Sequence, residues 1–289
     1  MVSRGHFMPI REHSRILRKN RQHLQITFQT IFLGVSMRSV FRTFFLLLLY
    51  FSVPLYAQSP ENETKKLLVA VMVSDDHYDA DKLLPPMMQR LGKENGWDVV
   101  ILHGQGTANF PNIDVLDKAD VLVVYIRRLA LPKEQLEKVK KFVKSGRGLV
   151  GLRTACHAFV SSAKVLPEHS QNWREFDRDV LGGNYHGHGK DELGSEIENV
   201  AAQSDSPILK EVTPTRWHSV GSLYYTEPVK EDATIYQTAS SSQRKNVPLT
   251  WTRMYGKTRI AFTALGHQKD FEIEAFQNLV RNLVHWAAQ

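Results

Sequence analysis

The sequence predicts an α/β fold in which a mainly parallel central sheet carries helices on both faces. Four apolar runs of strand length occur between residues 67 and 152, and helical patterns separate them. Uninterrupted apolar runs are typical of strands that are buried on both faces of a parallel sheet. Because the connections are short, we expect right-handed crossovers and a doubly wound sheet. Further strand patterns in the second half of the chain predict extra strands there.

The first strand is expected over residues 67–73, and a helix follows over 83–93. Pro85 and Pro86 fit the first turn of that helix, where backbone N–H groups have no partner within the helix. The other elements of this half are a strand over 97–102, a short helix over 113–118, a strand over 121–126, a helix that begins at Pro132 and ends at Ser145-Gly146, and a strand over 148–152. The lysines of the helix after Pro132 share one side, which indicates a solvated face.

The second half favours strands over 222–226, 234–239, 248–254 and 259–265. A final helix over 271–286 has apolar residues at helical spacing, so one of its faces is expected to be buried. The chain has no internal repeat, and no connection is long enough to require a second domain. Residues 58–289 are therefore predicted to form a single domain.

Residues 1–57 form a leader that contains a signal peptide pattern. Arg38 and Arg42 precede an apolar run over 44–55, and the small residue Ala57 ends the pattern before Gln58. This run is shorter than the roughly 20 apolar residues that span a bilayer as a helix. We therefore expect cleavage near Ala57 and a periplasmic or secreted mature protein.

The 36 residues before Met37 are an unusual prefix for a signal peptide. Translation that begins at Met37 would explain them. The alternative is a genuine cytoplasmic extension followed by an uncleaved anchor, which would then be the only expected contact with a membrane.

The net charge of +7 comes from the leader. Residues 1–57 hold eight of the 37 basic residues but one of the 30 acidic residues, so 29 of each sign remain in the domain. The domain therefore lacks the basic excess that binding to a phosphate backbone requires, and no nucleic-acid partner is expected. With Cys156 as the single cysteine, a disulfide scaffold is excluded.

In a doubly wound sheet, ligands bind beyond the carboxyl ends of the strands. Polar residues follow several of the predicted strands at this edge. They include Asp75, Asp76 and His77 after the first strand, the run 153–157 after the fourth, and Gly266-His267 after the last. A glycine-rich loop over 182–189 supplies Tyr185, His186 and His188. We expect these segments to form one site.

Three stretches carry a resemblance to a known family: GRGLVGLRTACHAF (146–159), WREFDRDVLGGNYHGHG (173–189) and PLTWTRMYGKTRIAFTALGHQ (248–268). Together with the closing NLVRNLVHWA helix, they resemble the ThuA-like (trehalose utilisation) family over nearly all of 66–287. The resemblance implies a class I glutamine-amidotransferase-like, flavodoxin-like three-layer α/β/α sandwich. It also implies a role in carbohydrate breakdown, including that of 3-keto sugars, and it places His267 at the site.

This chain departs from the family after the fourth strand. It has Gly151-Leu152-Arg153 where the family often has Gly-x-His. A cation at this position is costly to bury without an anionic partner, which Asp75, Asp76 or a ligand could supply. We therefore include Arg153 among the candidate catalytic residues, together with Cys156, His157 and His267.

Cys156-His157 allows two interpretations. A thiol beside an imidazole at a strand-to-helix turn is typical of a Cys-dependent amidase of the DJ-1/PfpI type, because its environment lowers the thiol pKa. However, the turn should come directly after Leu152, which would place Arg153 at the nucleophile position. The other interpretation is that Cys156 is a small buried residue on the following helix.

His186 and His188 stand two residues apart, as a metal chelate on an extended segment requires. A third ligand from His157, His218, His267 or Asp76 would complete a site for a divalent metal, our one cofactor hypothesis. Without a metal, the same imidazoles can transfer protons near neutral pH or bind sugar hydroxyls. The predicted substrate-binding residues are Asp76, His77, Tyr185, His186, His188 and His218.

The leading hypothesis is an exported carbohydrate-active enzyme that applies histidine acid/base chemistry to a sugar or a 3-keto-glycoside. Its expected partner is a small carbohydrate. Two alternatives remain open: a carbohydrate-binding module without catalysis, and the Cys-dependent amidase. The sequence does not identify the substrate or the oligomeric state.

Overall fold

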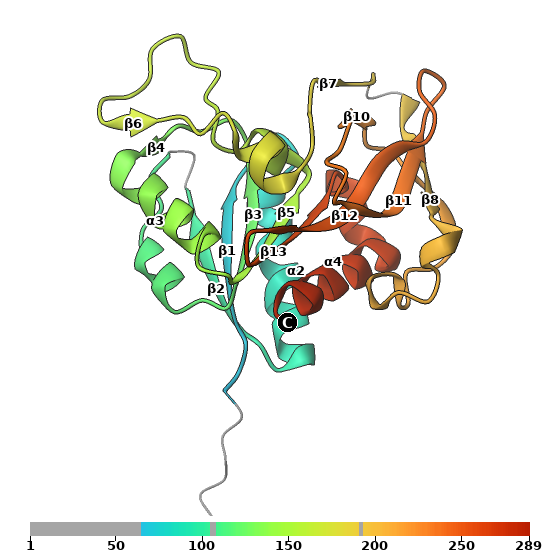
Figure 1. The fold of residues 1–289 in the computed structure, drawn as a ribbon, viewed down its shortest axis with the longest axis horizontal. Coiled ribbons are helices and arrows are strands. Elements are labelled where there is room, and N and C mark those ends of the chain that lie inside the picture. The colour runs from blue at the N-terminus through green and yellow to red at the C-terminus, as the bar shows by residue number, and fades with distance from the viewer. Residues whose placement is uncertain (1–64, 105–107, 191–192) are drawn as a thin grey trace, which may run out of the picture. The chain divides into compact units, whose positions relative to one another are not determined.

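The computed structural model describes residues 65–104, 108–190 and 193–289. Within these residues, a nine-stranded sheet has the order β2-β1-β3-β5-β13-β12-β11-β8-β9 (Figure 1). The parallel strands are β1 (Leu68–Ser74), β2 (Asp98–His103), β3 (Val121–Ile126), β5 (Gly148–Leu152) and β13 (Thr258–Thr263). The antiparallel extension consists of β12 (Val247–Tyr255), β11 (Thr234–Ser240), β8 (Ser195–Asn199) and β9 (Arg216–Ser219).

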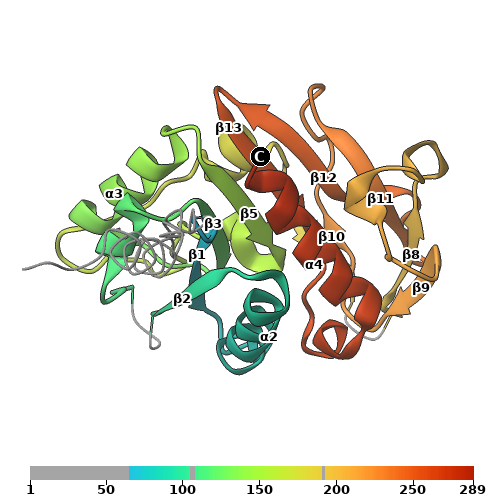
Figure 2. The ribbon, with the colours of Figure 1, turned by 90° about the horizontal axis from the view of Figure 1, so that it is seen from below.

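Helices cover both faces of the parallel strands (Figure 2). The helices α2 (Ala80–Asn95) and α4 (Glu274–Ala287) lie side by side on one face, where Arg90 donates a hydrogen bond to Gln277 at 2.7 Å. The helix α3 (Lys133–Val143) covers the other face, beside the short helix η1 (Ile113–Asp117). This arrangement confirms the predicted three-layer α/β/α sandwich, including the extra strands of the second half.

The remaining elements are short and lie in the connections. The short helices are η2 (Arg153–His157), η3 (Phe176–Leu181, one turn of π-helix), η5 (Ala201–Gln203), η6 (Pro207–Leu209) and η7 (Gln268–Glu272). Two small antiparallel pairs join β4 (Leu131–Pro132) to β6 (Ser170–Gln171) and β7 (Gly187–His188) to β10 (Tyr224–Tyr225).

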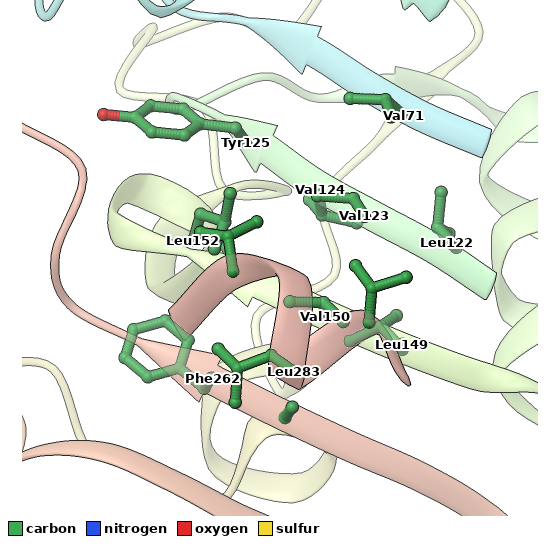
Figure 3. Close-up of a cluster of buried hydrophobic side chains, with 14 of the residues drawn as sticks. Val71, Leu122, Val123, Val124, Tyr125, Leu149, Val150, Leu152, Phe262 and Leu283 are labelled. Atoms are coloured by element: carbon green, nitrogen blue, oxygen red, sulfur yellow. The ribbon is translucent and has the colours of Figure 1, made fainter. Parts of the chain in front are cut away.

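The core forms because the central strands are apolar on both sides. All six residues of β3 are buried, and Figure 3 shows Val150 and Leu152 of β5 in one cluster with Leu283 of α4. Full burial of one such side chain contributes about 1.5–3 kcal/mol. Gly148 allows α4 to approach the sheet, since a Cβ atom there would lie 2.2 Å from the carbonyl oxygen of Ala287.

Several elements differ from the sequence predictions. The strand expected over 222–226 shortens to β10, which pairs with β7 and not with the main sheet. The last helix is divided at Ile273 into η7 and α4. Helix α2 begins earlier than predicted, after Asp79 in a left-handed conformation, so Pro85 and Pro86 lie inside the helix and not in its first turn.

The leader predicted over residues 1–57, with its signal peptide, lies outside the described residues. In the part of the chain that the structure describes, no helix combines the length and the apolar character needed to cross a membrane.

Candidate active site

Arg153 occupies the sharp turn directly after β5. Its φ of +40° lies in the left-handed region, which costs about 1–2 kcal/mol for a residue with a side chain. The residue is 2% exposed, and its guanidinium lies between the rings of Tyr78 and Tyr224, at 4.3 and 4.4 Å from their centroids. It also donates a hydrogen bond to the carbonyl oxygen of Ala264 at 3.0 Å. The structure thus places aromatic faces and backbone oxygen atoms around this cation, where the sequence suggested Asp75, Asp76 or a ligand.

The loop between β1 and α2 positions Tyr78. Buried Asp75 accepts hydrogen bonds from the backbone N–H groups of His77 and Tyr78, at 2.9 and 3.2 Å. Burial raises the pKa of Asp75 above its ordinary value, although these two hydrogen bonds oppose that rise. Asp76 and His77 themselves are exposed, and the ring of His77 meets that of Tyr78 edge-on at 4.5 Å.

Asp270 fixes the loop that carries His267. Its buried carboxylate accepts hydrogen bonds from the Ser219 hydroxyl at 2.6 Å and from the backbone N–H groups of Gly266 and His267, both at 2.9 Å. The Nδ1 atom of His267 accepts a hydrogen bond from the backbone N–H of Lys269 at 3.3 Å, which caps η7. Its ring lies 5.6 Å from that of Tyr78, which also neighbours the Arg153 guanidinium, but His267 is not among the residues that line the cavity described next.

A polar cavity of about 620 Å³ opens beside this turn at the carboxyl edge of the sheet. Four segments line it: the loop after β3, η2, the chain at and just before η3, and the glycine-rich loop that leads into β7. The wall includes Arg128, Cys156, His157, Asp177, Tyr185, His186 and His188. A second cavity, of about 640 Å³, lies beside β8 and contains none of the predicted site residues.

His157 is a neutral imidazole in the cavity wall. It is 7% exposed, its Nδ1 atom lies 3.3 Å from the Sγ atom of Cys156, and its ring lies 4.9 Å from that of Tyr185. Burial, reinforced by the positive charges of Arg128 and Arg127, lowers the pKa of His157 to about 3. At neutral pH the imidazole of His157 is therefore uncharged. It is not the imidazolium that would act as a general acid, the role that the sequence allowed.

Cys156 has the environment of a buried structural cysteine. Its Sγ atom is 3.3 Å from the carbonyl oxygen of Arg153, to which the thiol donates. Burial raises the thiol pKa well above its ordinary value, and the nearby charge of Asp177 acts in the same direction. Because the thiolate is the nucleophilic form, these properties oppose the amidase interpretation. Arg153, not Cys156, stands at the strained turn.

Asp177 is a site residue that the sequence analysis did not identify. Its Oδ2 atom accepts a hydrogen bond from the backbone N–H of Tyr185 at 2.7 Å, whereas its buried Oδ1 atom has no hydrogen-bond partner among the described residues. Burial raises the pKa of Asp177 to about 6. Nothing in the sequence separates it from Asp179, which pairs with Arg178 at the surface. A π-helical turn, frequent at functional sites, would have been the only signal, and it is visible only in three dimensions.

The two histidines of the glycine-rich loop are exposed and contact different tyrosines. The His186 ring lies 6.0 Å from that of Tyr225, and the His188 ring lies 6.0 Å from that of Tyr224. Their Nδ1 atoms lie 2.8 and 2.7 Å from the carbonyl oxygen atoms of Asn184 and Gly189. These contacts fix both rings by backbone hydrogen bonds.

The described residues do not supply the third ligand that a metal site at His186 and His188 would require. Over residues 65–104, 108–190 and 193–289, no three His, Cys, Asp or Glu side chains come together in a way that could hold a metal ion. His218, one of the predicted partners, lies on β9, where its Nδ1 atom is 2.7 Å from Glu196 of β8. It is not among the residues that line the cavity, and the next residue, Ser219, directs its hydroxyl to Asp270.

Arg128 is a second residue that the sequence analysis missed. It follows β3 by two residues, and its φ is +53°. The backbone N–H of Arg128 donates to the carbonyl oxygen of His157 at 3.2 Å, which ties this loop to η2. Its half-buried side chain lines the cavity and forms no hydrogen bond or ion pair with any described residue.

Comparisons with known proteins agree with this architecture. Among solved structures, a ThuA-like protein from Bacteroides uniformis has a TM-score of 0.59 at 15% identity, covering 79% of this chain and 94% of that one. A ThuA-like protein from Parabacteroides merdae has a TM-score of 0.57 at 16% identity, covering 78% and 91%. A protein described as cytoplasmic, from Salmonella typhimurium, has a TM-score of 0.51 at 16% identity, covering 76% and 98%. These likenesses show the fold.

No curated protein matches the sequence significantly. The profile of the family described as ThuA, trehalose utilisation, matches residues 69–287, a range that takes in nearly all the residues that the structure describes. The matched residues include the glycine-rich loop, which lines the cavity. They also include the strands β1 and β5 of the sheet and the helix α4 that covers it. The chain belongs to the ThuA family.

Proposed function

We propose that this protein is a carbohydrate-converting enzyme in which Asp177 transfers a proton to or from a sugar bound in the cavity. The observation that carries the proposal is the state of this carboxyl group, which combines a pKa of about 6 with a buried oxygen atom that has no hydrogen-bond partner among the described residues. A group with a pKa near the working pH can both accept and donate a proton efficiently. The association of the family with trehalose utilisation supports a sugar as the substrate.

The surrounding side chains suit a polyhydroxylated ligand. Tyr185 is half-buried and offers a ring face on which a pyranose can stack. Where His186 and His188 donate through Nδ1 to backbone carbonyl groups, each retains an Nε2 atom that can accept a hydrogen bond from a sugar hydroxyl. In this proposal the histidines bind the substrate, and the carboxyl group performs the proton transfer.

A 3-keto-glycoside is the substrate class that fits best. The ketone makes the C–H bonds on the adjacent carbons acidic, so a carboxylate can remove a proton there. Asp177 would accept the proton from C2, the electron pair of the broken C–H bond would form the C1–C2 double bond as the glycosidic C1–O bond breaks, and Asp177 would return the proton to the departing oxygen atom. The neutral imidazole of His157 lies nearby as a hydrogen-bonding group. A native disaccharide would instead require Asp177 to protonate the departing oxygen atom.

The test is proton NMR of the purified protein with native and 3-keto disaccharides. We expect new sugar signals with the wild type and a loss of turnover of about 10²–10⁴-fold in Asp177→Asn. Asp179→Asn is the matched control, because this residue lies on the same short helix but pairs with Arg178 at the surface. Equal turnover of Asp177→Asn and the wild type would contradict the assigned role.

The same spectra test the carbohydrate-binding alternative. A binding module would broaden the sugar signals without forming a product, and neither aspartate variant would change that behaviour. A complete absence of effects on every sugar would contradict both carbohydrate hypotheses.

We also propose that the protein is exported. The support is the signal peptide pattern of residues 37–57. N-terminal sequencing of the protein recovered from its native compartment tests this, with Gln58 as the expected first residue. A first residue at Met1 or Met37 would contradict cleavage.

A further inference from the structure

Two arginines hold strained backbone conformations at the same edge of the sheet. Arg128 and Arg153 follow the neighbouring strands β3 and β5, with φ values of +53° and +40°. Glycine would adopt these conformations without the cost that a side chain imposes. Strained positions of this kind cluster at active sites and ligand-binding loops. The two tyrosine rings and the backbone carbonyl group around Arg153 explain why an arginine occupies that turn. The described contacts of Arg128 give no such explanation.

The backbone around Arg128 is fixed, while its guanidinium has no hydrogen-bond or ion-pair partner among the described residues. Backbone N–H groups of residues 127–129 donate to the carbonyl oxygen atoms of Ser74, His157 and Ala158, at 3.0, 3.2 and 2.9 Å. The guanidinium nevertheless contacts no described hydrogen-bond acceptor. The loop is therefore rigid and presents a half-buried cation to the cavity.

Positive charge predominates in the cavity wall. Arg174 also lines the cavity without an ion pair to any described residue, whereas Arg178 is neutralised by Asp179 at 2.7 Å. Asp177 is the only acidic side chain among the lining residues. The charge of Arg128 reaches into the site, since it disfavours protonation of His157.

We propose that the cavity binds a carbohydrate that carries an anionic group, a carboxylate or a phosphate, and that Arg128 binds this group. This inference rests on the proposed function, because it specifies the substrate class of the same site. A planar guanidinium can form two parallel hydrogen bonds to either anion. Anchoring at Arg128 leaves the sugar ring to Tyr185 and Asp177, which line the same cavity and are joined by the hydrogen bond from the Tyr185 backbone N–H.

The experiment is calorimetric titration of the full chain with four probes: glucose, glucuronate, glucose 6-phosphate and inorganic phosphate. We expect glucuronate or glucose 6-phosphate to bind at least about tenfold more tightly than glucose, because hydrogen bonds to charged groups are stronger. The two anionic sugars distinguish a carboxylate from a phosphate.

Variants locate the anion. Arg128→Gln should reduce the preference for the anionic sugar to near that for glucose, and Arg128→Lys should restore part of it. Arg178→Gln is the matched control, because this arginine lies on the same wall but is already paired, so the preference should remain. Circular dichroism of each variant checks that the fold is intact.

The possible results separate the two proposals. If glucose binds as tightly as the anionic sugars, or if Arg128→Gln keeps the preference, this inference is overturned, and turnover of neutral sugars would still support the proposed function. If inorganic phosphate binds in an Arg128-dependent way and no sugar binds, the anion site is supported and the proposed function is contradicted. Absence of binding by all three anionic probes overturns this inference.

Discussion

Arg153 and Arg128 stand at equivalent places after adjacent strands, but their surroundings differ completely. Arg153 is 2% exposed, lies between two tyrosine rings and bonds to a backbone carbonyl group. Arg128 is half-buried on a rigid loop and bonds to no described side chain. The first cation is therefore part of the architecture, whereas the second is available to a ligand. The same contrast distinguishes the buried cluster of Tyr78, Arg153 and Tyr224 from the cavity beside it, which a ligand can enter.

The largest expected effect comes from removing the enclosed cation. Arg153→Ala should lower the free energy of unfolding by about 3–5 kcal/mol, because it removes two cation–π contacts and leaves a cavity. Chemical denaturation followed by tryptophan fluorescence measures the change. Arg153→Lys, which keeps the charge but loses the planar group, should lose less. A change below about 1 kcal/mol in Arg153→Ala would contradict the architectural role.

Asp177 and His157 should give opposite pH dependences of stability. The pKa of Asp177 is raised to about 6, so its contribution is full at pH below 3.8 and is lost as the pH rises to 6. The pKa of His157 is lowered to about 3, so its contribution is full above pH 6.5 and is lost as the pH falls. Between pH 4 and 6 the two slopes, about 1.4 kcal/mol per pH unit each, largely cancel.

Two variants reveal these slopes separately. Relative to the wild type, the stability of Asp177→Asn should rise with pH between 4 and 6, and that of His157→Phe should fall. Denaturant titrations at half-unit pH intervals measure both differences. Parallel curves for the wild type and Asp177→Asn would show that this carboxyl group has an ordinary pKa.

A smaller effect of opposite sign is expected at Arg128. Arg128→Gly should raise the free energy of unfolding by up to about 1 kcal/mol, because glycine relieves the left-handed conformation and no side-chain hydrogen bond or ion pair with a described residue is lost. Arg153→Gly, the matched change after β5, should destabilise the protein strongly. If both glycine variants lowered stability equally, the distinction between the two arginines would be wrong.

The smallest of these effects is expected in the reactivity of Cys156, which should be low in the folded protein. Iodoacetamide should alkylate the native protein at pH 7 far more slowly than the unfolded chain, because the thiol is buried and its pKa is raised. Mass spectrometry over time measures both rates. Rapid modification of the native protein would revive the amidase interpretation.

The sequence predicted the parallel half of the fold closely because its strands are buried on both faces. The strands predicted over 121–126 and 148–152 agree with β3 and β5, since continuous apolar runs leave little ambiguity. The strands β8 and β9 were missed, because each is short and alternates buried with exposed residues. Such half-exposed segments resemble loops in a single sequence.

The site was predictable where it depends on strand order. His157 and His267 lie near the edge that the doubly wound topology indicates. Asp177, Arg128 and Tyr78 were not identified, because burial and the absence of a partner are properties of the folded chain. His218 is not among the residues that line the cavity, and the pairing of β9 with β8, which places it beside Glu196, becomes visible only in the folded chain.

The position of β13 has a consequence for the order in which this protein can be completed. This strand comes from residues 258–263, yet it lies between β5 and the antiparallel strands, in the middle of the sheet. During synthesis from the N-terminus, more than a hundred further residues must be added after β5 before its partner β13 emerges from the ribosome. One edge of the apolar strand β5 is unpaired during that time. Exposed edges of this kind are prone to pair with other chains. We therefore expect that the unpaired edge of β5 must be protected from other chains until β13 and α4 have been synthesised.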